Sequence, residues 1–168
     1  MVRGRTSSKG FTIVELLIVV VVIAILAAIT IVSYTGITGR AYTASVQTEF
    51  RNAMQSIEKY KVENGLYPST GTNTELAAAN IRINTKNYDE TGSNFLYCVN
   101  NTTSRAALTA LGTNGVLYAQ STDRAFGPYT TYTISSYANI CSDLVGSSSA
   151  RYGRSASETP NWRVWVNP

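Results

Sequence analysis

The distribution of hydrophobic and polar residues divides the chain into segments of very different character. Residues 1–10 are short, basic and polar, and the stretch from Phe11 to Val32 that follows is almost entirely apolar. A helix over this stretch is roughly 33 Å long, enough to cross the hydrocarbon core of a bilayer. The basic flank predicts a cytoplasmic N-terminus, with everything after about Tyr34 outside. The pattern therefore predicts a membrane-spanning helix.

The pattern of residues 34–64 predicts that the same helix continues into water. Apolar residues recur there at roughly helical spacing, with a slip in phase near Ala44–Val46. They are Ile37, Ala41, Ala44, Val46, Phe50, Ala53, Ile57 and Tyr60. Asn64-Gly65 is a helix stop, and Pro68 prevents the helix from resuming. We expect one helix over residues 11–64, whose second half packs under a globular domain.

After Gly65 the chain consists of short segments between turn-rich stretches rich in Ser, Thr, Asn and Tyr. The strands we expect are Phe95–Val99, Val116–Gln120, Tyr129–Ile134 and Trp162–Val166. Short helices are expected at Thr74–Ala79 and Ser104–Gly112, and an extended segment at Ile81–Ile83. The predicted fold class is α+β, with a long N-terminal α-helix packed on a C-terminal antiparallel β-sheet.

One residue does not fit an ordinary membrane anchor. Glu15 lies inside the apolar stretch, where a carboxylate costs a few kcal/mol unless it is paired. It is therefore a candidate functional residue, and the alternative is a solvated position near the lipid headgroups. A plain secretory signal, cut near Ala24, Ala27 or Ala28, is a weaker interpretation, because an acid is unusual in its apolar region and the apolar run continues past these alanines.

The residues around Glu15 carry a specific resemblance. The string is Lys9-Gly10-Phe11-Thr12-Ile13-Val14-Glu15-Leu16-Leu17-Ile18-Val19. It resembles the processing site of type IV prepilins and pseudopilins, in which a prepilin peptidase cuts after the glycine and methylates the new terminal phenylalanine. The resemblance implies cleavage between Gly10 and Phe11, N-methylation of Phe11, and Glu15 as the assembly carboxylate. It covers about thirty residues.

The resemblance also implies an architecture and a role. Residues 1–10 would be a leader peptide, residues 11–64 the long helix with 11–33 as its transmembrane and polymerisation half, and residues 65–168 a β-rich head. The precursor would cross the cytoplasmic membrane once with its head outside, then join an extracellular pilus for adhesion, twitching motility or DNA uptake. Its partners would be further copies of itself, the prepilin peptidase, the membrane and the inner-membrane assembly machinery.

The sequence departs from this family where many pilins have a proline in the helix. The corresponding stretch, Ile29 to Tyr34, contains none, and Ala24 stands where a glycine is often found. If the helix loosens locally, we expect this between Thr30 and Gly39, where β-branched residues and glycines lower helix propensity.

Two other functions remain open at this stage. Within the same superfamily, the chain could be a pseudopilin of a type II secretion or competence system. From another class, it could be a monomeric membrane-anchored or secreted binding domain, which would be favoured if residues 1–10 remained on the mature protein.

The net charge of +4 raises the question of a nucleic-acid partner. Arg3, Arg5 and Lys9 lie in the leader, and without them eleven basic residues face ten acidic ones. The remaining basic residues are scattered, with no cluster typical of phosphate binding. Nucleic-acid binding is possible but not indicated.

The cysteine and histidine content bears on redox state and chemistry. Cys98 and Cys141, in an exported domain, predict one disulfide, the alternative being two buried free thiols in a reducing compartment. Because the chain has no histidine, Ser-His and Cys-His catalytic systems are excluded. We expect no enzyme, no catalytic residue, no cofactor and no metal. Asp89-Glu90 could ligate calcium, but a solvated acidic turn is the preferred interpretation.

Three smaller features complete the sequence analysis. The eleven tyrosines could form an adhesive face, but we interpret them first as strand and core residues. Trp162 and Trp165 have opposite strand parity, and we expect core or interface positions for both. Asn100 and Asn101 each begin an Asn-x-Thr sequence, a weak indication of glycosylation.

Overall fold

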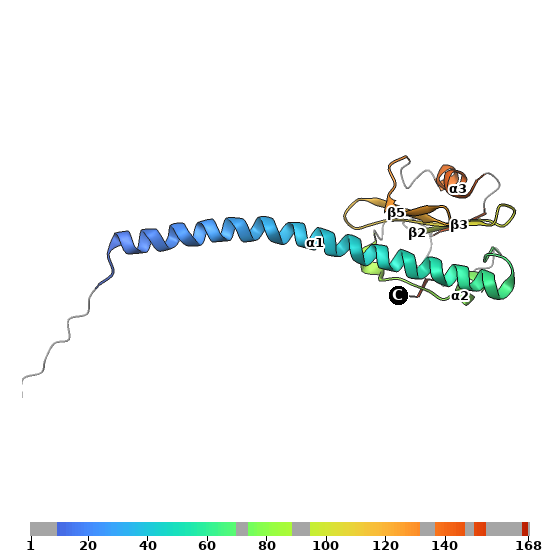
Figure 1. Cartoon of the computed structure of the whole chain (residues 1–168), viewed down its shortest axis with the longest axis horizontal. Helices are drawn as coiled ribbons and strands as arrows, with labels where there is room; N and C mark the ends of the chain where they lie inside the picture. The colour runs from blue at the N-terminus through green and yellow to red at the C-terminus, as the bar shows by residue number, and fades with distance from the viewer. Residues whose placement is uncertain are drawn as a thin grey trace, which may run out of the picture. The chain divides into compact units, whose positions relative to one another are not determined.

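The computed structural model describes residues 10–69, 74–88, 95–131, 137–146, 150–153 and 166–167. The chain divides into two compact units, Met1–Ala41 and Tyr42–Pro168, and the long helix α1 (Ile13–Asn64) runs from the first into the second (Figure 1). The predicted fold class is confirmed: a long N-terminal helix is followed by an antiparallel sheet.

Helix α1 ends where the sequence predicts. Gly65 has a φ of +82°, a left-handed conformation that glycine adopts without steric cost, and its N–H donates to the carbonyl of Lys61 at 2.7 Å. This bond satisfies one of the carbonyls left open at the end of a helix. Pro68 follows as a buried residue in the extended segment after the helix.

The second unit is built on one five-stranded antiparallel sheet with strand order β5-β4-β3-β2-β6. The strands are β2 (Phe95–Asn100), β3 (Arg105–Leu111), β4 (Leu117–Ser121), β5 (Arg124–Pro128) and β6 (Ala150–Gly153). Around the sheet lie α2 (Thr74–Ala78), the 3-10 turn η1 (Thr85–Asn87), α3 (Tyr137–Val145) and a parallel pair of β1 (Ile81–Arg82) and β7 (Val166–Asn167).

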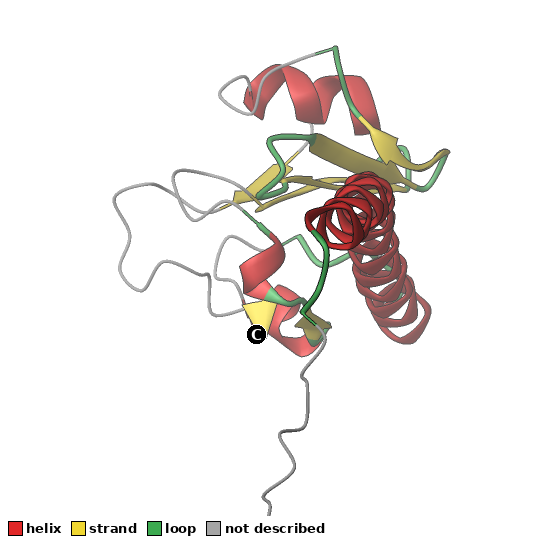
Figure 2. Cartoon of the chain, turned by 90° about the vertical axis from the view of Figure 1, so that its left-hand side faces the viewer, coloured by secondary structure: helices red, strands yellow, loops and turns green. Residues whose placement is uncertain are grey.

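Side chains alternate between two cores on opposite faces of this sheet. Phe95, Tyr97 and Val99 of β2 face the part of α1 that lies in this unit, whereas Leu96 and Cys98 face α3. Figure 2 shows α3 on one face of the sheet and α1 on the other. The period of two, expected for a strand, lets one sheet bury residues on both faces.

The predicted apolar stripe of α1 is confirmed in its C-terminal part and wrong in its N-terminal part. Val46, Phe50, Ala53, Met54 and Ile57 are buried against the sheet. The earlier members Ile37, Ala41 and Ala44 are exposed. The slip in phase near Ala44–Val46 therefore marks the point where α1 begins to pack on the sheet.

The predicted helix at Ser104–Gly112 is wrong, because the segment forms strand β3. Ser104 has a φ of +55° and belongs to the turn before the strand, so it is no helix cap. Ala106, Leu108 and Ala110 face α1, while Ala107 faces α3. Alanine and leucine favour a helix locally, but this segment pairs with β2 on one side and β4 on the other. Tertiary pairing thus overrides local propensity.

The predicted strand at Tyr129–Ile134 is displaced. The strand in this region is β5, which ends at Pro128, and Tyr129 follows it as a buried residue of the α3-side core. The N–H of Tyr129 donates to the carbonyl of Leu117 at 2.7 Å. Residues 132–134 lie outside the described residues, and of the predicted strand Trp162–Val166 only Val166 is described, in β7.

Four other predicted elements agree with the structure. Phe95–Val99 corresponds to β2, Val116–Gln120 to β4, and the short helix and extended segment after residue 73 correspond to α2 and β1. These segments have strong local signals, since the strands are dense in aromatic and aliphatic residues between turns.

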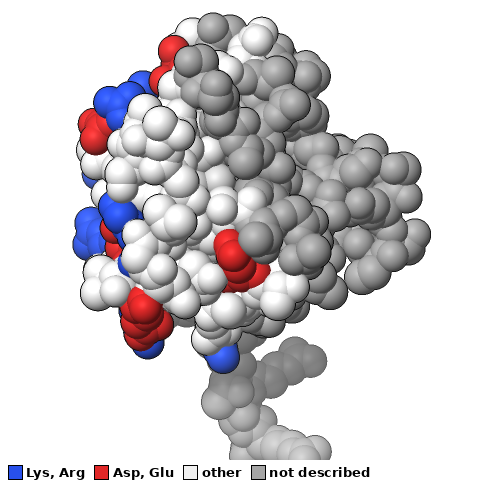
Figure 3. All heavy atoms as spheres, turned by 90° about the vertical axis from the view of Figure 1, so that its right-hand side faces the viewer, with Lys and Arg blue, Asp and Glu red and all other residues white. Residues whose placement is uncertain are grey.

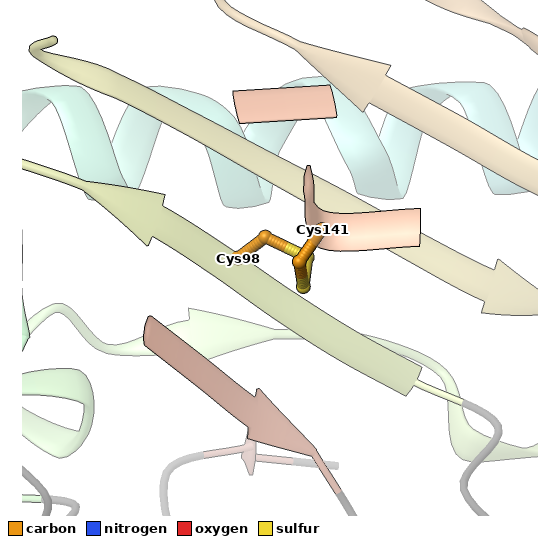
Figure 4. Close-up of a disulfide and its surroundings, with 2 residues drawn as sticks. All are labelled: Cys98 and Cys141. Atoms are coloured by element: carbon orange, nitrogen blue, oxygen red, sulfur yellow. A yellow bond between two sulfur atoms is a disulfide. The ribbon is translucent and has the colours of Figure 1, made fainter. Parts of the chain in front are cut away.

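A disulfide joins Cys98 of β2 to Cys141 of α3, as the cysteine pair predicts (Figure 4). The two Cα atoms are 5.3 Å apart and both residues are fully buried. The Tyr129 hydroxyl donates to the Asp143 carboxylate, and the Thr103 hydroxyl donates to the Val145 carbonyl at 3.3 Å. The disulfide, these hydrogen bonds to residues next to the strands, and its buried apolar residues thus hold helix α3 over the sheet.

A polar network fixes two further segments to α1 within the second unit. The Glu49 carboxylate accepts hydrogen bonds from the Asn87 amide at 2.6 Å and from the Tyr88 hydroxyl at 2.7 Å. The Tyr42 hydroxyl donates to the Asn87 carbonyl and accepts from the Thr113 N–H at 3.0 Å. Tyr88 is 1% exposed, and its hydroxyl reaches out of the core to the Glu49 carboxylate.

Two buried tyrosines predict that the second unit loses stability in alkali. Burial raises the pKa of Tyr88 above its usual value, and Glu49 raises it further. Burial also raises the pKa of Tyr67, followed by its hydrogen bond to Glu58 at 2.6 Å. Both tyrosines therefore keep their protons when the same residues in the unfolded chain ionise near pH 10, so the unfolding free energy falls as the pH rises above about 10.

We expect the unfolding free energy of Tyr88→Phe to fall less steeply above pH 10 than that of the parent chain. The slope should differ by up to about 1.4 kcal/mol per pH unit, which is the contribution of one proton. Denaturant unfolding between pH 8 and pH 12, followed by near-ultraviolet circular dichroism, measures it. The variant should also be less stable at pH 8, because it leaves the Glu49 carboxylate without one donor. An unchanged slope in Tyr88→Phe would contradict the role of Tyr88.

Candidate processing and assembly segment

The residues predicted to be processed lie immediately before α1. Gly10, Phe11 and Thr12 are not helical, and Ile13 is the first helical residue. Gly10 is exposed and Phe11 is 81% exposed. The peptide bond between them is therefore outside the hydrogen-bonded helix and open to solvent, which suits attack by a peptidase.

Thr12 and Glu15 form a reciprocal cap at the start of α1. The Thr12 N–H and the Thr12 hydroxyl each donate to Glu15 Oε2 at 2.8 Å, and the Glu15 N–H donates to Thr12 Oγ1 at 3.2 Å. This is the capping-box arrangement, in which a threonine at the N-cap and a glutamate three residues later satisfy each other's open groups. It also places a negative charge at the positive end of the helix dipole.

Glu15 is the only charged residue between Phe11 and Gly39. Within the described residues the ion pairs are Lys59–Glu63 and Arg105–Asp123, so no cation of the described chain pairs with Glu15. A carboxylate that is oriented by its own helix and lacks a countercharge is suited to receiving a cation from another molecule. An ammonium group would supply both the charge and hydrogen-bond donors.

The helix that follows Glu15 exposes its apolar side chains on every side. All described side chains from Phe11 to Ile31 are exposed, with large aliphatic residues such as Leu16, Leu26 and Ile29 near 60%. α1 is long and apolar enough to cross a membrane by length and composition. A helix that is hydrophobic all round requires burial in lipid or against other helices.

Helix α1 is unbroken through Thr30–Gly39, where the sequence has its weakest helix propensity. Two threonine hydroxyls bond back along the helix, Thr30 to the Ala27 carbonyl at 2.9 Å and Thr38 to the Tyr34 carbonyl at 3.2 Å. An alanine in place of Gly36 or Gly39 would have open space around its Cβ, so nothing in this chain requires glycine there.

The other candidate sites fall partly outside the described residues. The possible calcium ligands Asp89-Glu90 and the tryptophans Trp162 and Trp165 lie outside the described residues. Among the residues that are described, no three metal-ligating side chains come together. On the face of the molecule in Figure 3, basic and acidic side chains lie beside one another along the left-hand edge, and most of the described surface there is uncharged.

The tyrosines are mainly core residues in the second unit. Tyr67, Tyr88, Tyr97, Tyr118 and Tyr129 are each 2% exposed or less. An adhesive face built on them is therefore wrong, and the interpretation as core residues holds for these five. The side chains of the other tyrosines in the C-terminal part, at positions 132, 137 and 152, are outside the description.

The two Asn-x-Thr sequences are used structurally. The Asn101 side chain accepts from the Tyr67 N–H and donates to the Tyr67 carbonyl, both at 3.0 Å. Asn100 is 5% exposed and its side chain accepts from the Thr103 N–H at 3.1 Å. A glycan on either asparagine would disrupt these bonds, so we expect none.

Comparison with known proteins agrees with the geometry of this segment. Residues 5–31 match the family model described as the prokaryotic N-terminal methylation motif. The chain is 29% identical over 75 residues to the type IV major pilin protein PilE of Neisseria gonorrhoeae, covering 45% of each chain. It is 40% identical over 63 residues to the type IV wide pilus major component PilA4 of Thermus thermophilus, covering 38% of this chain and 48% of that one.

A component of a secretion machine is also similar. The type II secretion system core protein G of Klebsiella michiganensis is 30% identical over 66 residues, covering 39% of this chain and 46% of that one. The chain spans less than half the length of each of these relatives. No solved structure matches the chain.

These findings define a protein whose membrane-length helix begins with an N-terminal methylation motif. In that segment the chain is similar to type IV pilins and to a pseudopilin of a secretion system. These relatives are structural proteins, which agrees with the expectation that this chain is not an enzyme.

Proposed function

We propose that the chain is the precursor of a structural subunit of a type IV pilus. In this proposal a prepilin peptidase cuts between Gly10 and Phe11 and methylates the Phe11 amine. The processed chain then polymerises through its N-terminal helix into a surface filament, with Glu15 as the assembly carboxylate. The observation that carries the proposal is the exposed Gly10–Phe11 junction, placed directly before a capped glutamate and a wholly exposed apolar helix.

The mechanism follows from what α1 exposes. Before assembly, lipid covers the aliphatic surface of α1 as the precursor spans the cytoplasmic membrane with its head outside. A helix leaves the bilayer at low cost only if other helices replace the lipid, and further copies of the same chain provide them. Pairing the terminal amine of one copy with Glu15 of another would favour one axial register, because charges attract strongly in a low-dielectric surrounding. The inner-membrane assembly machinery would drive the transfer.

A second candidate in the same family is a pseudopilin, and the similarity to the secretion protein G supports it. A pseudopilin would use the same processing and the same helix, but would form a short filament within the cell envelope. Electron microscopy of cells that express the chain at its native level separates the two, because only a pilus subunit gives long surface fibres that contain it.

Mass spectrometry of the sheared surface fraction tests the proposal. We expect the N-terminal peptide to begin at Phe11 and to carry one added methyl group. An intact Met1 terminus, or a cut near Ala28, would overturn the proposal in favour of an anchored or secreted monomer. The same terminus found only in the membrane fraction would favour the pseudopilin.

A further inference from the structure

Helix α1 begins its contact with the rest of the second unit through polar groups. Tyr42 is half-buried and its neighbours Ala41 and Ala44 are exposed, and among the described side chains of α1 the first buried one is Val46. Opening a segment that buries little apolar surface costs much less than opening a segment of the core. Residues 42–45 are therefore the part of this contact that opens most easily.

The Tyr42 hydroxyl joins α1 to two segments that are distant in the sequence. It donates to the carbonyl of Asn87, at the end of η1, and accepts from the N–H of Thr113, between β3 and β4, at 3.0 Å. The Thr113 N–H also donates to the Asn87 carbonyl at 3.0 Å, so the three groups form a closed ring. One helix turn later, Ser45 Oγ accepts from the Asn87 side-chain amide at 3.2 Å. Hydrogen bonds thus hold this part of α1 in place.

Gly112 provides the space that the Tyr42 hydroxyl occupies. It is buried directly before Thr113, and a Cβ atom on it would overlap the Tyr42 hydroxyl and lie 2.7 Å from Asn114 Oδ1. Because close-packed atoms cannot approach so closely, a side chain here would force the hydroxyl to move. The close approach of Tyr42 therefore requires glycine at this position.

We propose that Tyr42 and Gly112 form a latch that fastens the start of α1 to the second unit. While the Tyr42 hydroxyl is bound, residues 42–45 stay in place. When its hydrogen bonds break, this part of α1 separates alone, and the apolar core from Val46 onward stays closed. A pull on α1 from its N-terminal side reaches Tyr42 before Val46, so the latch opens first under tension. The latch is a property of the single chain and does not depend on the proposed function.

Hydrogen exchange of single amides tests the latch, in the full chain in detergent micelles and under conditions where exchange reports the opening equilibrium. Tyr42→Phe keeps the aromatic ring and removes the hydroxyl, while the Thr113 N–H keeps its bond to Asn87. We expect the Thr113 amide to exchange about fivefold faster, which corresponds to the loss of about one hydrogen bond. The Tyr129 amide, which donates to the Leu117 carbonyl in the same unit, should be unchanged.

Two results of this measurement would overturn the latch. Equal acceleration of the Thr113 and Tyr129 amides would mean that residues 42–45 open only together with the whole unit. An unchanged Thr113 amide would mean that the Tyr42 hydroxyl does not fasten the helix.

Tyr60→Phe is the matched control. Tyr60 is also a half-buried tyrosine of α1 that packs against the core, but it lies about five helix turns beyond Tyr42. We expect Tyr60→Phe to leave the exchange of the Thr113 amide unchanged. The same fivefold acceleration in this variant would show a general effect of removing a phenol from α1, and would contradict the assignment to Tyr42.

A double-mutant cycle tests the contact between Tyr42 and Gly112. Gly112→Ala is expected to accelerate Thr113 exchange about tenfold or more, because the added methyl group displaces the hydroxyl. In Tyr42→Phe the hydroxyl is absent, so the same alanine should have a smaller effect by a factor of about three or more. Equal effects in both backgrounds would show that the two residues are independent and would overturn the latch. The Tyr42→Phe measurement decides the matter alone if Gly112→Ala does not fold.

Gly127→Ala is the control for adding a methyl group. A Cβ atom on Gly127 would meet no other atom within 4 Å, so we expect this variant to leave the Thr113 amide unchanged. Acceleration as large as that in Gly112→Ala would attribute the effect to loss of any glycine in the sheet region, and would contradict the specific contact with Tyr42.

Discussion

Glu15→Ala is expected to leave processing largely intact and to reduce filament assembly more than tenfold. The peptidase junction lies five residues earlier in an exposed, non-helical segment, so it does not depend on the glutamate side chain. Assembly does depend on it in the proposed mechanism, because the alanine removes both the helix cap on Thr12 and the charge that would meet a terminal ammonium group. An unpaired ammonium in an apolar surrounding is far less favourable than a paired one.

The measurement is the amount of cut chain in the membrane and in the sheared filament fraction. Glu15→Gln is the informative companion, because it keeps the size of the side chain and a hydrogen-bond acceptor but removes the charge. We expect it to assemble poorly as well, which would attribute the effect to charge. Normal filament yield from Glu15→Ala would show that Glu15 has no role in assembly, whatever the head domain does.

The N-terminal half could be predicted from the sequence because its signals are local. Uninterrupted apolar residues from Leu16 to Ile29 leave few alternatives to a membrane-length helix, and the Asn64-Gly65 stop is a property of a few neighbouring residues. This helix can therefore be predicted without knowing which residues pack against it. For the same reason, the family resemblance also rests on this segment.

The capping box was missed although its signal is in the sequence. Thr12-Ile13-Val14-Glu15 has the threonine and glutamate three residues apart, directly before an apolar run, which is the pattern of a helix N-terminus. From the sequence, Glu15 is a candidate functional residue in the membrane or a solvated residue near the headgroups, and its part in a helix cap is not predicted. The structure adds that its own chain already engages one carboxylate oxygen.

The sheet could be predicted only in part, because its strands depend on distant partners. Arg105–Leu111 is compatible with a helix or a strand by local pattern, and pairing with β2 and β4 decides it. The small residues Ala106 and Ala110 lie on the sheet face that shares a core with α1. Strand β5 shows the same limitation, since Arg124–Pro128 lacks the density of aromatic and aliphatic residues that identified β2 and β4.

Removal of the disulfide is expected to lower the unfolding free energy of the second unit by about 4 kcal/mol. The chain-entropy model gives this value for a loop of the observed sequence separation of 43 residues. Helix α3 would then depend on its buried residues Ile140, Leu144 and Val145 and on hydrogen bonds such as those from Thr103 and Tyr129. The double variant Cys98→Ala, Cys141→Ala, unfolded by denaturant in parallel with the parent chain, measures the loss.

Reduced parent protein is the control for the disulfide variant. It keeps both sulfur atoms in the core, so the difference between the reduced parent chain and the double alanine variant measures the cavity alone. Hydrogen exchange should show that α3 amides lose protection before those of β2 and β3, because α3 covers one face whereas these strands have partners on both edges. An unfolding midpoint equal to that of the oxidised parent would contradict the prediction. It would mean that the apolar contacts of α3 are enough to keep this helix packed on the sheet without the disulfide.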